Sequence, residues 1–181
     1  MTTVSHRRGV FPGSFNPLTI AHLEISRLAM RAHDLDEVHL VLSRVALDKP
    51  APPGPSFDQR IEILEADASA YDWLHIGVTD QQLIAEIAAG FEVVIMGADK
   101  WKQVHEVKYY DDAAARDDAL ASLPTVVVAE RAGIDIAGVE ATVLRTPKEL
   151  HDVSSTAARA GARELMAPQA ALEWNDGAAA S

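Results

Sequence analysis

Residues 9–22 read GVFPGSFNPLTIAH, and this stretch decides the fold. An apolar strand over Arg8–Phe11 leads into a polar turn, after which apolar residues recur at helical spacing over residues 21–32. Free backbone N–H groups and the positive end of a helix dipole meet in such a turn, at the edge where open α/β sheets bind ligands. The stretch therefore predicts a phosphate site, and the alternative is a plain tight turn made by Gly13 and Pro17.

Two side chains at the start of this helix are suited to contacting an anion. Thr19 and His22 lie three residues apart, and therefore on one side of the helix start. A hydroxyl and an imidazole in these positions can reach one anion together. The alternative is that His22 is a partly exposed helix residue without a ligand.

Five more apolar runs alternate with helical stretches, a pattern that predicts a parallel sheet with helices between its strands. The run FEVVIM is polar only at Glu92, as expected of a strand covered on both faces. We predict a single α/β domain over residues 1–181, Rossmann-like and doubly wound, with a parallel sheet flanked by helices. Residues 1–5 and 176–181 are expected to be disordered. The five runs cover residues 38–42, 73–78, 91–96, 125–129 and 141–144.

Hydroxyl residues mark the expected helix starts. Ser56 and Gln59 have the spacing of a capping box, in which each side chain bonds the backbone of the other residue. Thr79 and Gln82 repeat this spacing before a short helix that is expected to stop at Gly90. Further helices are expected over residues 111–123 and from Ser154 onward.

Composition excludes several classes of protein. The chain has 181 residues, of which 48% are apolar, and this is enough for one domain with a hydrophobic core. It lacks the run of about 18 apolar residues that a membrane span requires, and it lacks a signal-peptide pattern, so we expect a cytoplasmic protein without membrane association. The absence of cysteine excludes a thiolate nucleophile. A net charge of −11 argues against nucleic-acid binding, and an anionic substrate requires locally concentrated cations.

A second segment, DVSSTAARAG at residues 152–161, places three hydroxyl residues at a helix start. Ser154, Ser155 and Thr156 are followed by Arg159, whose guanidinium is a planar fork suited to phosphate oxygens. A plain helix cap needs one hydroxyl and no arginine. The segment is therefore a candidate cradle for a polyphosphate, and ordinary capping is the alternative.

These two segments resemble the two signatures of the nucleotidyltransferase superfamily. GVFPGSFNPLTIAH is similar to the [HT]xGH signature, with Ala21 in place of its glycine, and VSSTAAR is similar to the ISSTxxR signature. IMGADKW, FDQRIEIL and APQAALEW are also similar to segments of nicotinate or nicotinamide mononucleotide adenylyltransferases. The resemblance extends over nearly the whole chain.

The resemblance implies transfer of AMP from ATP to a mononucleotide, a step of NAD biosynthesis, with release of pyrophosphate. By motif position, His22 would donate to the α-phosphate, and Thr19 would occupy the variable Thr or His position. Mg²⁺ would be bound mainly through the phosphates of ATP, with few protein ligands. The β- and γ-phosphates would be held by Ser154, Ser155, Thr156 and Arg159, and Gly13, Ser14 and Phe15 would line the nucleotide pocket.

The acceptor side follows from the expected strand order. Gly97 and Asp99 come after a strand that neighbours the first one in a doubly wound sheet, so they would face the same crevice. Asp99 would accept a ribose hydroxyl, or would instead cap the next helix. Lys49 and Arg60 are the candidate cations for the acceptor phosphate. Enzymes of this group stack the pyridine ring on aromatic residues, for which Trp101, Tyr109 and Tyr110 are the candidates here, because Thr79 and Asp80 occupy the usual Trp-Glu pair.

The alternatives share the phosphate chemistry. They are a pantetheine-phosphate adenylyltransferase, a cytidylyltransferase acting on a small phosphate, and a nucleotide-binding homologue without turnover. In each case the partners are a nucleoside triphosphate, ATP first, and a phosphorylated small molecule. A homo-oligomer remains open.

Overall fold

The structure is a computed structural model that describes residues 6–45, 54–131, 133–134, 136 and 140–174. Lys49 and the two termini that are expected to be disordered lie outside these residues. None of the helices in the described ranges is long and apolar enough to cross a membrane.

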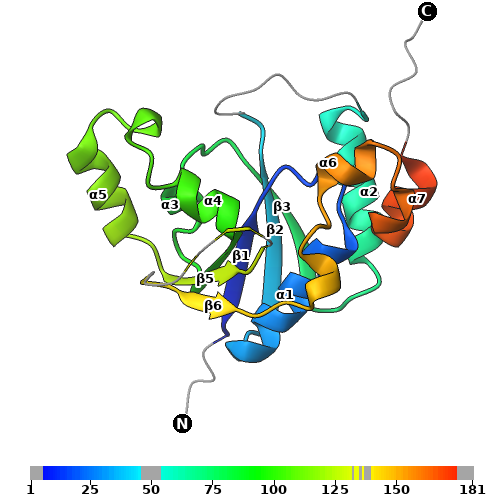
Figure 1. Ribbon diagram of the computed structural model, residues 1–181, viewed down its shortest axis with the longest axis horizontal. Coiled ribbons are helices and arrows are strands. Elements are labelled where there is room, and N and C mark those ends of the chain that lie inside the picture. The colour runs from blue at the N-terminus through cyan, green and yellow to red at the C-terminus, as the bar shows by residue number, and fades with distance from the viewer. Residues whose placement is uncertain (1–5, 46–53, 132, 135, 137–139, 175–181) are drawn as a thin grey trace, which may run out of the picture.

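Six parallel strands form one sheet in the order β3-β2-β1-β4-β5-β6. All six expected strands are present, and β4 lies beside β1, which confirms the doubly wound arrangement (Figure 1). The connection from β1 leads to β2 on one side, whereas the connection from β3 crosses to β4 on the other side of β1. The strand order thus reverses beside β1, and folds of this kind bind ligands in the crevice at the carboxyl end of that point. The strands are β1 (Arg8–Pro12), β2 (Glu37–Ser43), β3 (Leu74–Thr79), β4 (Val93–Gly97), β5 (Thr125–Ala129) and β6 (Thr142–Leu144).

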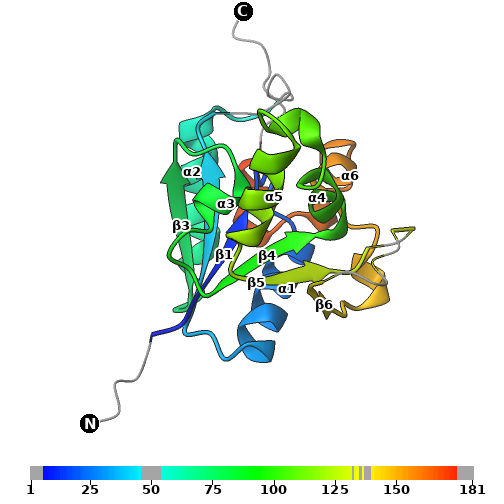
Figure 2. The same cartoon turned by 90° about the vertical axis from the view of Figure 1, so that its left-hand side faces the viewer.

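Helices cover both faces of the sheet, with α3, α4 and α5 on one side and α1, α2 and α7 on the other (Figures 1 and 2). Successive β4 residues point to opposite faces: Val93 and Ile95 join one core, whereas Val94 and Met96 join the other. This confirms that the strand is covered on both faces. The helices are α1 (Ile20–Ala32), α2 (Phe57–Ala68), α3 (Ile84–Ile87), α4 (Ala98–Gln103), α5 (Ala113–Ala121), α6 (Ser155–Arg159) and α7 (Pro168–Glu173), with 3₁₀ turns η1 (Val107–Tyr109), η2 (Lys148–Leu150) and η3 (Arg163–Leu165).

One of the two expected capping boxes forms. Ser56 Oγ accepts the Gln59 N–H at 3.2 Å, and Gln59 Oε1 accepts the Ser56 N–H at 2.9 Å. The prediction of a capping box at Thr79 is wrong. Thr79 is the last residue of β3 that pairs with β2, and its hydroxyl accepts the N–H of Gln81 instead.

The helix after β3 is therefore shorter than expected. It covers only Ile84–Ile87, and the Glu86 carboxylate accepts the N–H of Leu83 at 3.2 Å before its first turn. The residues between Thr79 and Leu83 form an irregular connection rather than a helical turn.

A buried carboxylate fastens α7 to α2. Asp67 on α2 is 3% exposed, and its two oxygens accept the N–H groups of Gln169 at 2.8 Å and Ala170 at 3.1 Å. The residue before α7 is Ala167, which has no side chain that can cap the helix. Asp67 thus satisfies, from another helix, the free N–H groups at the start of α7.

Replacing Asp67 with alanine is expected to lower the free energy of unfolding by about 2 to 3 kcal/mol, because the N–H groups of Gln169 and Ala170 lose their acceptor. Urea denaturation measures the change. Glu65→Ala is the matched control, since Glu65 lies on the same helix and is exposed, and its effect should stay within about 0.5 kcal/mol. Equal stability of the two variants would contradict the capping role.

Candidate active site

A crevice of about 1380 Å³ opens beside the carboxyl ends of β1, β2, β4 and β5. Its described lining is rich in cations although the whole chain carries a net charge of −11. This fits the expectation that an anionic substrate requires a local concentration of positive charge. The basic lining residues are Arg44, Arg60, Lys100, Lys108, Arg131 and Arg159, and the acidic ones are Asp58, Asp99 and Glu130.

The turn after β1 is shaped by two close contacts. The Gly13 N–H donates to the Val41 carbonyl at 3.1 Å, and a Cβ on Gly13 would lie 2.8 Å from the ring of Phe15. Phe15 has a positive φ of 42°, and its ring packs edge-on against His22 at a centroid distance of 5.2 Å. Only a glycine fits at position 13, and the turn places Gly13, Ser14 and Phe15 in the crevice lining as expected.

Thr19 and His22 form a closed hydrogen-bonded pair at the start of α1. The Thr19 N–H donates to His22 Nδ1 at 3.1 Å, and Thr19 Oγ1 lies 2.8 Å from the same nitrogen. Because Nδ1 accepts a backbone N–H, the proton of the neutral imidazole resides on Nε2. His22 lines the crevice, so it presents an Nε2–H donor there, whereas the fully buried Thr19 orients the ring.

His22 is neutral at physiological pH. Burial of the ring lowers the pKa of His22 to about 4, and the positive charge of Arg131 lowers it further in the same direction. The ordinary value is 6.5. A neutral imidazole can donate from Nε2 to a phosphate oxygen but adds no positive charge of its own.

We expect ¹⁵N-detected NMR to show His22 protonated at Nε2 alone at pH 7, with a titration midpoint near pH 4. Because the unfolded chain takes up the proton at higher pH, this residue should destabilise the fold as the pH falls from about 6.5 to 4. A midpoint between pH 6 and 7, or an Nδ1–H tautomer, would contradict the assignment.

The three hydroxyls at α6 have different partners. Ser154 caps the helix, because its Oγ accepts the Ala157 N–H at 3.1 Å, and it is absent from the described crevice lining. The Ser155 hydroxyl donates to the Pro17 carbonyl at 2.8 Å, which ties α6 to the turn after β1. Ordinary capping thus accounts for Ser154, while Ser155 and Thr156 line the crevice.

Arg159 makes the second tie between these segments. Its Nη1 donates to the Asn16 carbonyl, and its Nη2 lies 3.4 Å from Thr156 Oγ1. The remaining N–H groups of the guanidinium are available to a ligand. The structure thus brings Arg159 and His22 to the same crevice, as the sequence predicts.

Gly97 and Asp99 also line the crevice, and Asp99 has an unexpected partner. The helix cap of α4 is Gly97, so the alternative interpretation of Asp99 as a cap is wrong. Asp99 accepts a hydrogen bond from Arg131 Nη1 at 2.9 Å. Sequence reasoning missed Arg131, although a cation that closely follows a buried strand such as β5 is a usable signal for a residue at this edge of the sheet.

The structure places some of the predicted acceptor residues in the crevice lining, but not all of them. Arg60 lines the crevice, where its Nη1 donates to the Ser14 carbonyl at 3.0 Å. Tyr109 and Tyr110 line it as well. Lys49 lies outside the described residues.

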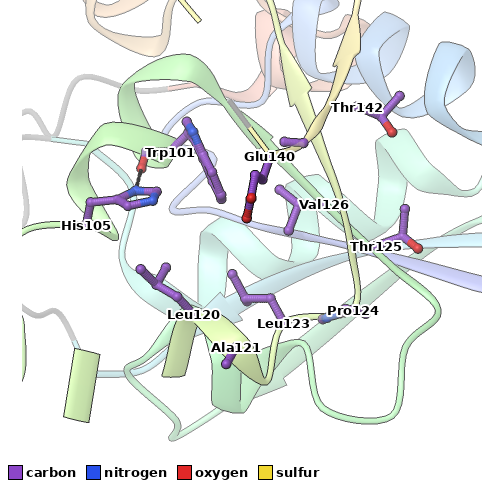
Figure 3. Close-up of a pocket in the computed structure, with 11 residues that line it drawn as sticks. Trp101, His105, Leu120, Ala121, Leu123, Pro124, Thr125, Val126, Glu140 and Thr142 are labelled. Atoms are coloured by element: carbon purple, nitrogen blue, oxygen red, sulfur yellow. Dashed lines mark hydrogen bonds between the residues drawn. The ribbon is translucent and has the colours of Figure 1, made fainter. Parts of the chain in front are cut away.

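Trp101 is not brought to the crevice. It lines a separate cavity of about 850 Å³ beside α5, with its ring 4.5 Å from that of His105 (Figure 3). A helix turns by about 100° per residue, so Trp101 lies roughly 200° around α4 from Asp99 and faces another side.

Comparison with known proteins agrees with this geometry. The family described as cytidylyltransferase-like matches residues 10–161, from β1 through α6. The chain belongs to the cytidylyltransferase-like family. It is a nucleotidyltransferase, and the match contains both the His22 turn and the Arg159 helix.

This nucleotidyltransferase is similar to a nicotinate-nucleotide adenylyltransferase over most of its length and to a phosphopantetheine adenylyltransferase over a shorter stretch. A probable nicotinate-nucleotide adenylyltransferase of Coprothermobacter proteolyticus is 27% identical over an alignment 165 residues long, which covers 84% of this chain and 80% of the relative. A phosphopantetheine adenylyltransferase of Dinoroseobacter shibae is 38% identical over 64 residues, 35% of this chain and 34% of its own.

The solved structures agree in fold. Nicotinic acid mononucleotide adenylyltransferase of Plasmodium falciparum, complexed with NaAD, superposes with a TM-score of 0.63 at 16% identity, covering 86% of this chain and 83% of that one. The same enzyme complexed with APC gives a TM-score of 0.63 at 14% identity, with the same coverage.

Proposed function

We propose that this nucleotidyltransferase transfers AMP from ATP to nicotinate or nicotinamide mononucleotide. An oxygen of the acceptor phosphate attacks the α-phosphorus of ATP and forms a new P–O bond. The bond from the α-phosphorus to the oxygen that bridges it to the β-phosphate breaks, and pyrophosphate leaves. The acceptor is already an anion, so the protein needs no general base and contributes positioning and charge stabilisation.

The observation that carries the proposal is that a neutral His22 and Arg159 both line one cation-rich crevice. His22 Nε2–H is suited to donate to the α-phosphate as negative charge grows there. Arg159 uses two of its nitrogens on Asn16 and Thr156 and keeps N–H groups for the β- and γ-phosphates. Thr156 accepts from Arg159, so its own hydroxyl proton is free to donate to a phosphate.

The remaining lining residues fit the other parts of the two substrates. The Asp99 oxygen that is not bonded to Arg131 is suited to accept a ribose hydroxyl. Arg60 lies against the turn that leads to His22, where an attacking acceptor phosphate must approach. Ser155 holds the turn and α6 together, which keeps His22 and Arg159 in register.

In this proposal Mg²⁺ is bound mainly by the phosphates of ATP. The described residues contain no group of three His, Asp or Glu side chains that could hold a metal ion, and Asp99 in the crevice is engaged by Arg131. This fits a cation that arrives on the triphosphate and neutralises part of its charge.

Pyrophosphate release tests the reaction. Purified protein with Mg²⁺ is given ATP or CTP, and each triphosphate is combined with nicotinate mononucleotide, nicotinamide mononucleotide, phosphopantetheine or small phosphorylated alcohols. Release with ATP and a pyridine mononucleotide is the expected result. ATP binding without release for any acceptor would overturn the catalytic proposal and indicate a nucleotide-binding homologue.

A second candidate acceptor is phosphopantetheine. It is favoured by the 38% identity of a 64-residue stretch to the Dinoroseobacter shibae enzyme. The likeness to the nicotinate-nucleotide relative spans 84% of the chain, which is why we place the pyridine mononucleotides first. Release with phosphopantetheine alone would reverse this order.

A further inference from the structure

One crevice cation, Lys100, forms no ion pair with the residues that the structure describes, and it has no role in the reaction described above. Lys100 on α4 lines the crevice, and its Nζ donates to Gln103 Oε1 at 2.6 Å. Gln103 in turn donates from Nε2 to the Tyr109 hydroxyl at 2.8 Å, so its side chain is held in one orientation. None of the ion pairs among the described residues includes Lys100.

The other crevice cations on this side of the sheet are neutralised. Arg131 pairs with Asp99 at 2.9 Å, and Lys108 pairs with Glu106 at 2.6 Å. Lys100 is also half-buried, and burial lowers the pKa of its amine. A half-buried ammonium that contacts only a neutral amide is stabilised by an incoming anion.

The position of Lys100 separates it from the triphosphate residues. It lies on α4, whereas Thr156 and Arg159 lie on α6, and Figure 1 shows these two helices on opposite sides of β1. Residues of both helices line the crevice. The crevice lining also has apolar residues that are suited to a flat ring. Val41, Ile87 and Val104 belong to the buried cluster that includes Ala98 of α4, and the partly buried Ile84 packs against it.

We propose that Lys100, oriented by Gln103, binds a carboxylate at the end of the acceptor remote from its reacting phosphate. This inference rests on the proposed function and names the acceptor as an acid, with nicotinate mononucleotide favoured over the corresponding amide. The apolar lining residues cover the ring, and the ammonium supplies a charge-assisted hydrogen bond to the carboxylate. An amide at the same place leaves the ammonium without a counter-ion.

Lys100→Met tests the inference through the two pyridine mononucleotides. We expect the KM for nicotinate mononucleotide to rise by about 10- to 100-fold with little change in kcat, because a charge-assisted bond to the bound acid is lost. The KM for nicotinamide mononucleotide and the KM for ATP should change less than about threefold. Lys100→Arg keeps the charge and should retain most of the preference for the acid.

Lys102→Met is the matched control. Lys102 lies on the same helix, is exposed and is absent from the described crevice lining, so no kinetic constant should change. Circular dichroism and thermal unfolding establish that each variant is folded. If Lys100→Met raises the KM for both mononucleotides equally, the inference is overturned, because Lys100 would then contact the phosphate that both share. An unchanged ratio of the two KM values would overturn it as well.

Failure of the inference is distinguishable from failure of the proposed function. Wild-type protein that turns over the amide in preference to the acid keeps the proposed function and overturns the role of Lys100. If neither pyridine mononucleotide supports turnover, the proposed function fails, and calorimetric titration then decides the inference without turnover. Binding of nicotinate mononucleotide that is weakened by Lys100→Met, with binding of the amide unaffected, supports it, and absence of binding overturns it.

Discussion

Replacing His22 with alanine should lower kcat for pyrophosphate release by about 10²- to 10³-fold, while the Kd for ATP changes only a few-fold. The reason is that the Nε2–H bond strengthens as charge develops on the α-phosphate, whereas ground-state ATP is held mainly by other groups. Steady-state kinetics and calorimetric titration of ATP measure the two quantities separately.

The matched control for this variant is His105→Ala. His105 is a histidine of the neighbouring cavity and is absent from the described crevice lining, so its removal should leave kcat unchanged. His22→Gln serves as a second variant, because an amide oxygen can accept the Thr19 N–H and preserve the local fold. A kcat within tenfold of wild type for a folded His22 variant would show that the imidazole is not the donor.

The second large effect is expected for Arg159. Arg159→Ala should weaken ATP binding by about 10- to 100-fold, because a charge-assisted pair of bonds to the triphosphate is lost. The change also removes the bond to the Asn16 carbonyl, which helps to hold α6 against the turn after β1. We therefore expect kcat to fall as well, because the position of His22 relative to α6 becomes less fixed. Calorimetric titration with ATP and with a non-hydrolysable analogue measures the affinity.

Two further variants define what Arg159 contributes. Arg159→Lys keeps the charge but not the planar fork, and it should recover only part of the affinity. Arg31→Ala removes an exposed arginine from the far end of α1 and should leave ATP binding unaffected. ATP affinity and rate that remain unchanged in Arg159→Ala would remove the basis for the triphosphate site.

Much of the architecture was predictable because it depends on local pattern. Apolar runs separated by helical stretches identified all six strands, and the run at residues 91–96 indicated a strand covered on both faces. Both candidate phosphate-binding segments are likewise recognisable in the sequence, since hydroxyl, histidine and arginine residues cluster at helix starts. The start of β4 was two residues later than expected, at Val93.

The errors lie where tertiary contacts decide the outcome. The spacing of Thr79 to Gln82 predicts a helix cap, but the pairing of β3 with β2 keeps Thr79 in the strand. The partner of Asp99 is Arg131, which is 32 positions away, and no local pattern gives that distance.

The sequence also does not predict which side of α4 faces the crevice. This six-residue helix has too few positions for a periodic pattern to show which side faces the crevice. The aromatic Trp101 was therefore favoured as a substrate residue, whereas the structure turns the neighbouring Lys100 toward the crevice.

The bonds from Ser155 to Pro17 and from Arg159 to Asn16 join segments that lie 138 and 143 positions apart. A third hydrogen bond, from the Ala167 N–H to the Leu18 carbonyl at 3.0 Å, also joins the turn after β1 to the C-terminal part of the described chain. Such distant pairings raise the contact order and must close late, since a long loop has to be ordered first. During synthesis the six strands therefore emerge from the ribosome before residues 155–167, and we expect the sheet to assemble before the His22 turn is tied to α6.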